Sequence, residues 1–310
     1  YEVSNMCKGC LAHPCMEVCP RDAISMVNGK SYIDQSKCIK CGKCKSACPY
    51  DAISKKERPC AQSCGVGAIE TDKNGRAWIN PKKCVSCGMC MVNCPFGAVS
   101  DKSQIFQLAR ALAEGDEIIA EVAPAYVGQF GDNITPRNLK AALMKMGFKD
   151  VYEVALGADI GAIAEAHHYV EKVVSGELPF LLTSCCPSWA MLAKTYFPDL
   201  VDKVSQELTP MVATARTIKK TNPDARVVFI GPCAAKKLEA MRRTVRSDVD
   251  FVVTYEELQA MFDAKNINLK EFEAESSLHN ATGAGRGYAV AGGVADAIEK
   301  CVKEYYPGVE

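Results

Sequence analysis

Two turns that join a strand to a helix carry the cysteines best placed for chemistry. In LLTSCCPSWAML (181–192), the apolar run ending at Leu182 predicts a buried strand, and Cys185 and Cys186 follow in a polar turn. Pro187 suits the first helical position, where its missing N–H group would have no partner. Ligands of open α/β sheets usually bind at such turns. The pattern therefore predicts a ligand site around the two cysteines.

A second turn of the same kind lies downstream. The β-branched and aromatic stretch RVVFIG (226–231) predicts a strand that leads to Cys233, and the helix expected next begins with Lys236 and Lys237. Lysines at helix ends are usually solvated, but beside a cysteine one of them could donate hydrogen bonds to an anionic ligand. Two cysteine-bearing strand ends predict one metal site shared between them.

Cysteine dominates the composition, with 18 among 310 residues, 14 of them in the first third. Disulfide scaffolds are small secreted chains with poor cores, whereas this chain continues into a well-patterned α/β half. We therefore expect metal-bound thiolates in a reducing compartment, the cytoplasm. Lys+Arg and Asp+Glu both total 37, so charge does not indicate nucleic acid as a partner. No apolar run approaches a membrane span, and no membrane insertion is expected.

Two cysteine runs follow the bacterial ferredoxin pattern C-x2-C-x2-C-x3-C-P. In this pattern three thiolates bind one 4Fe–4S cluster and the fourth reaches the partner cluster, whereas zinc sites use separate C-x2-C pairs. An earlier run has one extra residue, and a further run keeps only its last two cysteines. In chain order the four sets are Cys7, Cys10, Cys15 and Cys19; Cys38, Cys41, Cys44 and Cys48; Cys60 and Cys64; and Cys84, Cys87, Cys90 and Cys94.

Crossed ligation between neighbouring runs predicts about three 4Fe–4S clusters before residue 100. Cys60 and Cys94 are left with too few partners for a fourth cluster, and a pairing of the second run with the fourth stays open. The predicted ligands are Cys7, Cys10, Cys15 and Cys48 for cluster one; Cys38, Cys41, Cys44 and Cys19 for cluster two; and Cys84, Cys87, Cys90 and Cys64 for cluster three.

Strand and helix patterns alternate after residue 100, which predicts an α/β domain with a mostly parallel sheet covered on both faces. We expect a ferredoxin-like α+β iron–sulfur domain over 1–100 and this α/β domain over 101–310. The expected strands are 117–126, 151–156, 181–182, 226–231 and 250–254, and the expected helices are 105–114, 135–147, 159–175, 208–220, 256–264 and one from Pro187.

The segment GAGRG (283–287) is too poorly flanked for a dinucleotide fingerprint, so its glycines are expected to allow close packing. His167 and His168 lie on an expected helix, where histidines are more often surface or core residues than ligands.

TSCCPSW (183–189) and GPCAAKKLE (231–239) resemble the first two signature motifs of the iron-only (FeFe) hydrogenases. AEVAPA, LGAD and TGAGRGYAVAGGV resemble further family segments in the same order, so the resemblance covers about residues 40–310. It implies reversible reduction of protons to H2, with electrons relayed through 4Fe–4S clusters to an H-cluster. The H-cluster is a 4Fe–4S cube bridged to a diiron unit with CO, cyanide and an azadithiolate. Ferredoxin or another redox subunit is the implied electron partner.

The resemblance also implies roles for single residues. Cys186 and Cys233 would ligate the 4Fe part, Cys185 would pass protons to the azadithiolate amine, and Lys236 would hydrogen-bond an iron cyanide. The implied proton path consists of Glu165, Ser205, Glu239 and His168, and Pro124 and Gly231 would line the cofactor.

Four positions depart from the family pattern. Gly231 stands for a methionine beside the diiron unit, Ala125 for a serine, Met211 for a glutamine and His168 for a glutamate of the proton route. His168 could still relay protons, because a histidine changes charge near neutral pH. The altered pocket predicts a divergent member with a tuned rate or bias, or a sensory role.

The family's third motif supplies two further cysteines, and no such motif follows Val294. Cys301 stands alone and is expected to be a buried packing residue. Since the sequence starts without Met, we expect a truncated part of a longer hydrogenase. The alternative is an electron-transfer or H2-sensing relative without a complete H-cluster.

Overall fold

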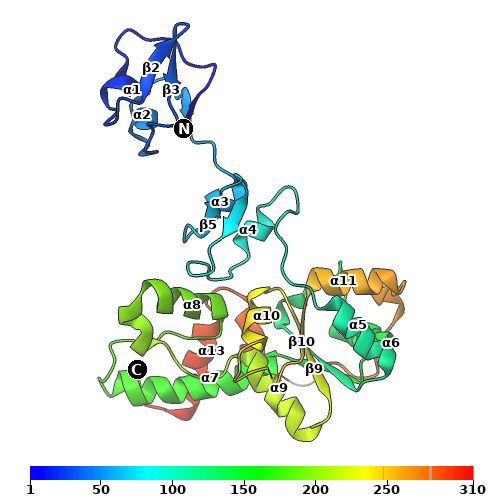
Figure 1. The fold of residues 1–310 in the computed structure, drawn as a ribbon. Helices are drawn as coiled ribbons and strands as arrows, with labels where there is room; N and C mark the ends of the chain where they lie inside the picture. The colour runs from blue at the N-terminus through cyan, green and yellow to red at the C-terminus, as the bar shows by residue number, and fades with distance from the viewer. Residues whose placement is uncertain (247, 279–280, 310) are drawn as a thin grey trace.

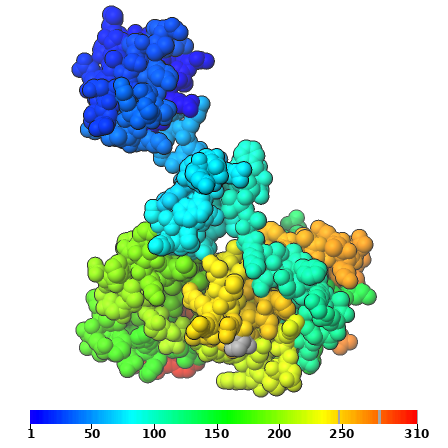
Figure 2. All heavy atoms as spheres, in the orientation of Figure 1, coloured from blue at the N-terminus to red at the C-terminus, as the bar shows by residue number. Residues whose placement is uncertain are grey.

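The computed structural model describes residues 1–246, 248–278 and 281–309, which form two small lobes and one larger α/β body (Figure 1). The space-filling view shows the first lobe standing apart from the rest (Figure 2). The predicted iron–sulfur region therefore comprises two lobes joined by an extended segment, 55–58. Its boundary near residue 100 stays a prediction.

Each lobe is built from short antiparallel strand pairs and single-turn helices. In the first lobe β1 pairs with β4 and β2 with β3, and in the second β5 pairs with β6. The elements of the first lobe are β1 (Glu2–Val3), α1 (Pro14–Glu17), β2 (Ile24–Val27), β3 (Lys30–Ile33), α2 (Lys43–Ala47) and β4 (Ile53–Ser54). Those of the second lobe are α3 (Pro59–Gln62), β5 (Ile69–Thr71), β6 (Ala77–Ile79) and α4 (Met89–Val92).

The α/β body confirms the predicted fold class, because its sheet has the order β10-β9-β7-β8 with every pair parallel. The strands are β7 (Ile118–Val122), β8 (Asp150–Glu153), β9 (Arg226–Gly231) and β10 (Phe251–Thr254). The helices are α5 (Ile105–Glu114), α6 (Pro136–Met146), α7 (Ala155–Tyr169), α8 (Pro187–Tyr196), α9 (Pro210–Thr221), α10 (Ala235–Ala240), α11 (Tyr255–Ala264), α12 (Gly283–Arg286) and α13 (Gly293–Tyr305). Short 3-10 or π segments are η1 (Pro124–Tyr126), η2 (Val170–Val174), η3 (Pro198–Lys203), η4 (Leu269–Glu271) and η5 (Gly287–Ala289).

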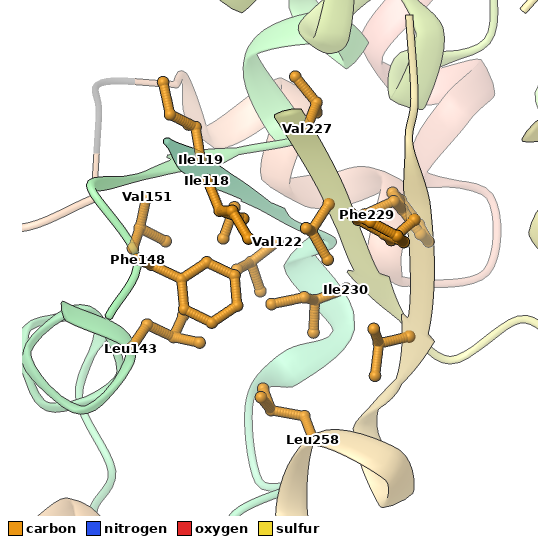
Figure 3. Close-up of a cluster of buried hydrophobic side chains, with 14 of the residues drawn as sticks. Ile118, Ile119, Val122, Leu143, Phe148, Val151, Val227, Phe229, Ile230 and Leu258 are labelled. Carbon is orange, nitrogen blue, oxygen red and sulfur yellow. The ribbon is translucent and has the colours of Figure 1, made fainter. Parts of the chain in front are cut away.

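One continuous apolar core lies between the sheet and its helices. Side chains of β7 and β9 meet Leu143 of α6 and Leu258 of α11 in this core (Figure 3). Every residue of β7 is buried, and all of them except Glu121 are apolar. Such a run is typical of a parallel strand covered on both faces.

The local signals that set helix ends are confirmed best in α6. The Thr135 hydroxyl accepts a hydrogen bond from the Asn138 N–H group, and the Asn138 side-chain oxygen accepts one from the Thr135 N–H group, which forms a capping box. Gly147 ends the helix in the left-handed region with φ 115°, a conformation that costs glycine little.

Three strand predictions are wrong in extent or existence. The strand predicted at 117–126 ends at Val122, and Pro124 already opens the 3-10 segment η1. The strand predicted at 151–156 ends at Glu153, because α7 already begins at Ala155. The buried strand predicted before Cys185 is only one parallel bridge, between Leu182 and Val204, and Leu182 is half-buried. This short run follows Pro179, which cannot donate to a ladder, and lies outside the four-stranded sheet.

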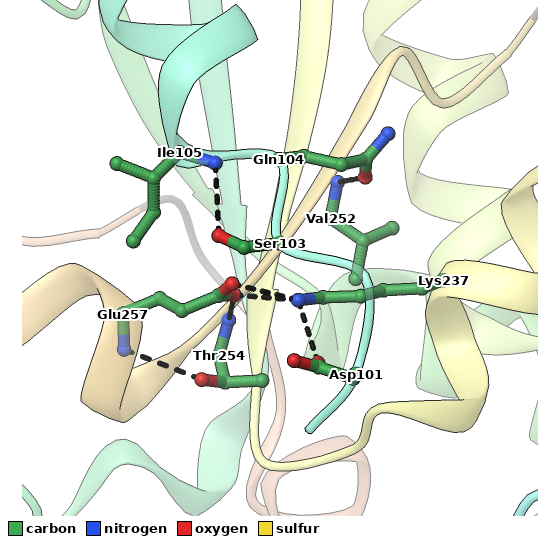
Figure 4. A network of polar contacts seen from close by, with 8 residues as sticks. All are labelled: Asp101, Ser103, Gln104, Ile105, Lys237, Val252, Thr254 and Glu257. Atoms are coloured by element: carbon green, nitrogen blue, oxygen red, sulfur yellow. Dashed lines mark hydrogen bonds and ion pairs between the residues drawn. The ribbon is translucent and has the colours of Figure 1, made fainter. Parts of the chain in front are cut away.

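A buried network of ion pairs connects the segment that follows the second lobe to the α/β body (Figure 4). The Lys237 ammonium contacts Asp101 Oδ2 at 2.7 Å and Glu257 Oε2 at 2.8 Å, and its side chain is only 7% exposed. Next to it, the Val252 N–H group donates to Gln104 Oε1 at 2.8 Å. These contacts fix the segment between the lobe and α5. No helix among the described residues is both long and apolar enough to cross a membrane.

Candidate cluster sites and active-site pocket

The first lobe gathers the cysteines predicted for cluster two around one small cavity. The cavity is lined by Cys19, Cys38, Cys41 and Cys44. Gly42 adopts a left-handed conformation with φ 81°, which turns the chain between Cys41 and α2. The set combines three cysteines of one run with the fourth of the other, as crossed ligation requires.

For cluster one the structure gives fewer contacts. The Cys7 sulfur accepts a hydrogen bond from the Ser31 N–H group at 3.4 Å, and the Cys15 sulfur lies 3.3 Å from the Ser31 hydroxyl. Both cysteines therefore surround one serine of β3. Cys48 packs on the apolar cluster that includes Cys15.

The second lobe gathers Cys64, Cys84, Cys87 and Cys90 around one pocket, the set predicted for cluster three. Burial raises the pKa of the Cys90 thiol, and the charges of the other three raise it further. Cys60 and Cys94 do not line this pocket. Because the second and fourth runs lie in different lobes, the structure favours pairing within each lobe.

Among the described residues, no three Cys, His, Asp or Glu side chains converge on one ion. The assignment of the gathered cysteines to 4Fe–4S clusters follows the ferredoxin-type spacing of the runs, and it stays a prediction.

We call the surroundings of Cys185, namely Lys236, Glu239, Glu165 and Ser205, the candidate pocket. Lys236, on α10, donates to the Cys185 carbonyl oxygen at 3.2 Å and to Glu239 Oε2 at 2.7 Å. Thr209, just before α9, donates its hydroxyl to Glu239 Oε1 at 2.8 Å. Lys236 and Glu239 are both buried. The lysine is thereby held against the turn that carries the cysteine pair.

Titratable groups of the predicted proton path also meet here. Glu165 of α7 is buried, which raises its pKa to about 7; a hydrogen bond from the Ser205 side chain partly offsets this rise, and the charge of Glu207 adds to it. Burial also raises the pKa of the Cys185 thiol, the Lys236 cation partly offsets that rise, and Glu165 is among the charges that add to it. The pocket therefore favours protonated acids near neutral pH.

For the remaining predicted site residues, the structure gives their burial and their place on the helices and strands. Cys186 precedes α8 and is exposed, while Cys233 precedes α10 and is half-buried; α8 and α10 pack together. His168 lies one turn from Glu165 on α7 and is half-buried. Pro124 opens η1 at the sheet edge where β9 ends in Gly231. The predicted fully buried Cys301 is only half-buried on α13.

Two residues that interact with this group of side chains were not singled out from the sequence. Glu121 is fully buried on β7, and a charged residue inside an apolar strand was the signal that could have revealed it. Tyr288 is half-buried, with its pKa raised by burial and by the charges of Cys185 and Glu165. No sequence pattern indicates that contact, because it joins distant parts of the chain.

A side chain at Gly231 would clash with its neighbours. A Cβ atom at this position would lie 2.6 Å from two ring atoms of Phe229 and 3.1 Å from the Ala123 Cβ. The Phe229 ring therefore occupies the space next to Gly231. The two residues are i and i+2 on one strand, so they share a sheet face.

Replacing Gly231 with alanine is expected to destabilise the protein by about 1–3 kcal/mol, the range for overpacking a well-packed core. Chemical unfolding monitored by circular dichroism measures the loss. Gly283→Ala is the matched control, because nothing lies within 4 Å of its Cβ position. A Gly231→Ala protein as stable as the Gly283→Ala protein would contradict the clash, and Phe229→Leu in the same chain should restore part of the loss.

Comparison with known proteins shows the family of this chain. Residues 116–310 match the family described as "Iron only hydrogenase large subunit, C-terminal domain", and residues 31–54 and 77–100 match a 4Fe–4S binding domain. Iron hydrogenase 1 of Clostridium pasteurianum is 30% identical over 319 residues, covering 94% of this chain and 55% of that protein. The periplasmic Fe hydrogenase large subunit of Nitratidesulfovibrio vulgaris is 32% identical, covering 89% of this chain and 68% of that protein.

A solved structure of apo FeFe-hydrogenase HydA1 from Chlamydomonas reinhardtii has a similar fold. It superposes with a TM-score of 0.54 at 28% identity, covering 67% of this chain and 60% of that one. A shorter similarity, 32% identity over 105 residues, links the chain to a cytosolic Fe–S cluster assembly factor of Kluyveromyces lactis. The chain thus spans about half to two thirds of the hydrogenases it matches. With its cluster motifs, parallel sheet and cysteine-lined pocket, this chain belongs to the iron-only hydrogenase large-subunit family, as a divergent member.

Proposed function

We propose that the protein serves reversible reduction of protons to H2, with electrons arriving through 4Fe–4S clusters from ferredoxin or another redox subunit in the cytoplasm. The observation that carries this proposal is the placement of Lys236 between the Cys185 carbonyl oxygen and Glu239, with Glu165 near enough to raise the pKa of the Cys185 thiol. Gathering four ionisable groups that are buried or half-buried would be costly without a function.

The H-cluster fits this pocket in part. Cys186 and Cys233 would hold its 4Fe portion, and residues 1–310 supply these two of the four cysteines that the family uses. When bound, the group would supply the redox chemistry of hydrogen formation. The chain's own residues would fix charge through Lys236 and hold protons at the Cys185 sulfur and the Glu165 carboxyl.

The second lobe would deliver electrons to this pocket. The cavity around Cys64, Cys84, Cys87 and Cys90 is also lined by Ala234, Lys237 and Leu238. These residues begin α10 directly after Cys233. A cluster in this cavity would lie beside the chain segment that leads to the pocket.

The test is H2 production by the native gene product after anaerobic maturation, combined with infrared spectroscopy. We expect H2 evolution with a reduced donor, together with CO and cyanide vibrations. Reducible 4Fe–4S clusters without either signal would overturn the hydrogenase proposal.

The second candidate function is electron transfer or H2 sensing without catalysis. It is favoured by the similarity to an Fe–S assembly factor and by the altered positions Gly231, Ala125, Met211 and His168. It predicts reducible clusters without H2 turnover, so the same assay separates the two functions.

The cluster-three assignment makes its own prediction. Replacing Cys64 with serine is expected to remove or weaken one cluster and lower the iron content by up to about four atoms per chain. Cys60→Ser is the matched control, because Cys60 lies four residues away on the same segment but not in the pocket. Iron analysis and electron paramagnetic resonance of anaerobic protein measure both. Equal iron loss in the two variants, or about sixteen iron atoms instead of twelve in residues 1–100, would contradict the assignment.

A further inference from the structure

Glu121 is a buried acid whose carboxyl group has no hydrogen-bond partner among the described residues. It sits on β7, between β9 and β8, in register with Phe229. Residues in register on parallel strands share a face of the sheet, so Glu121 shares the face of Phe229 and Gly231. Its exposure is 0%, and neither carboxylate oxygen has a hydrogen-bond partner among the described residues.

The charges around Glu121 do not balance if every acid is ionised. The groups that interact with it electrostatically are the Lys236 cation and the Glu239 carboxylate, which are themselves paired at 2.7 Å. Burial raises the pKa of Glu121 well above its usual value, Lys236 lowers it and Glu239 raises it. One cation thus faces two buried carboxyl groups, and an unpaired buried carboxylate is very costly.

We propose that Glu121 is a neutral carboxylic acid in the folded protein. Neither of its oxygens has a hydrogen-bond partner among the described residues, and the Lys236 ammonium is already paired with Glu239 at 2.7 Å. An ionised Glu121 would therefore be a buried charge without a partner, which is very costly. Because Lys236 also donates to the Cys185 carbonyl oxygen, a neutral Glu121 leaves the lysine with the two contacts that hold it in place.

This proposal concerns the pocket's own charges and does not depend on the reaction proposed above. It is tested by the pH dependence of stability in the full chain. A carboxyl group whose folded pKa is raised stabilises the fold fully below its unfolded pKa, and this contribution is lost as pH rises through the folded pKa. Wild type should therefore lose stability relative to Glu121→Gln as pH rises above about 4.5.

The expected size follows from proton linkage. For each pH unit in which only the folded state keeps the proton, the unfolding equilibrium constant of wild type rises about tenfold relative to Glu121→Gln. Glu304→Gln is the control, because Glu304 is exposed on α13, and it should follow the wild-type curve. Parallel curves for wild type and Glu121→Gln, or a loss of stability in Glu121→Gln at every pH, would overturn the proposal.

Infrared spectroscopy tests the proton directly, also if Glu121→Gln fails to fold. At about pH 9 Glu165, with its pKa of about 7, is ionised, so a remaining protonated-carboxyl band in wild type is expected from Glu121. The band should be absent from Glu121→Gln. No band in wild type would overturn the neutral acid, and so would a band of equal size in Glu121→Gln.

Discussion

Replacing Cys185 with alanine is expected to lower H2 turnover by about 10²–10⁴-fold, the usual contribution of a positioned acid or base. The Cys185 thiol sits in a pocket that favours its protonated form, beside Glu165 and Lys236. Alanine would remove the proposed proton carrier but keep the Lys236 hydrogen bond, since that bond is made to the backbone carbonyl. Turnover with a reduced donor and the iron content of the same preparation are the two measurements.

The matched control for this prediction is Cys301→Ala, a half-buried thiol on α13. It should retain turnover, and both variants should retain the iron content of the N-terminal lobes. Unchanged turnover in Cys185→Ala would remove the assigned role. A loss of iron in that variant would instead indicate damage to the clusters.

The second large effect concerns stability. Arg286 holds the buried Glu153 carboxylate through two hydrogen bonds, of 2.7 and 2.8 Å, from its Nε and an Nη atom. Glu153 is only 2% exposed, so Arg286→Ala would leave a buried charge without its cation. Breaking a buried pair in this way costs about 3–5 kcal/mol, and we expect the lower end because Arg286 is half exposed. Thermal unfolding should show a midpoint about 6–12 °C lower.

An exposed ion pair provides the comparison. Arg110 pairs with Glu114 one helical turn away, and both side chains are exposed. Arg110→Ala is expected to cost far less stability, because water and salt screen an exposed pair. If Arg286→Ala lost no more stability than Arg110→Ala, the bidentate pair would not anchor α12 to β8.

The Arg286 contact also explains the segment GAGRG, which the sequence leaves with only an expectation of close packing. Thr282 caps α12 through its hydroxyl, and a Cβ at Gly285 would lie 2.3 Å from the Ala155 carbonyl oxygen. Glycine is thus required where α12 meets α7, while nothing lies within 4 Å of a Cβ at Gly283 or Gly287. Pattern alone could not show which glycine makes the contact.

Much of the fold could be predicted because its signals are local. Thr135 and Gly147 mark the ends of α6, and the apolar runs of β7, β9 and β10 indicate buried parallel strands. The strand predicted at Leu182 failed because a short apolar run beside a proline does not reveal whether it joins a sheet.

Some residues of the candidate site could also be predicted from local sequence signals, and others could not. Motif spacing could predict the cysteine sets of the lobes, and Lys236 could be predicted from its place beside Cys233. Glu121 offered only the signal of a charge inside an apolar strand. The Glu153 contact could not be predicted, because its partner Arg286 lies 133 residues away. Such contacts leave no periodic trace in the chain.

The ion network at Lys237 has a consequence for the speed of electron delivery. Electron tunnelling slows steeply with distance, so a hop between two centres proceeds at one rate only if their separation is constant. In the proposed electron relay, the contacts of Asp101 and Glu257 with the buried Lys237 would hold the second lobe and the α/β body at one separation. The first lobe has only the extended segment 55–58 before the second. A spread of tunnelling distances, and hence of rates, would therefore arise between the two lobes and not at the pocket.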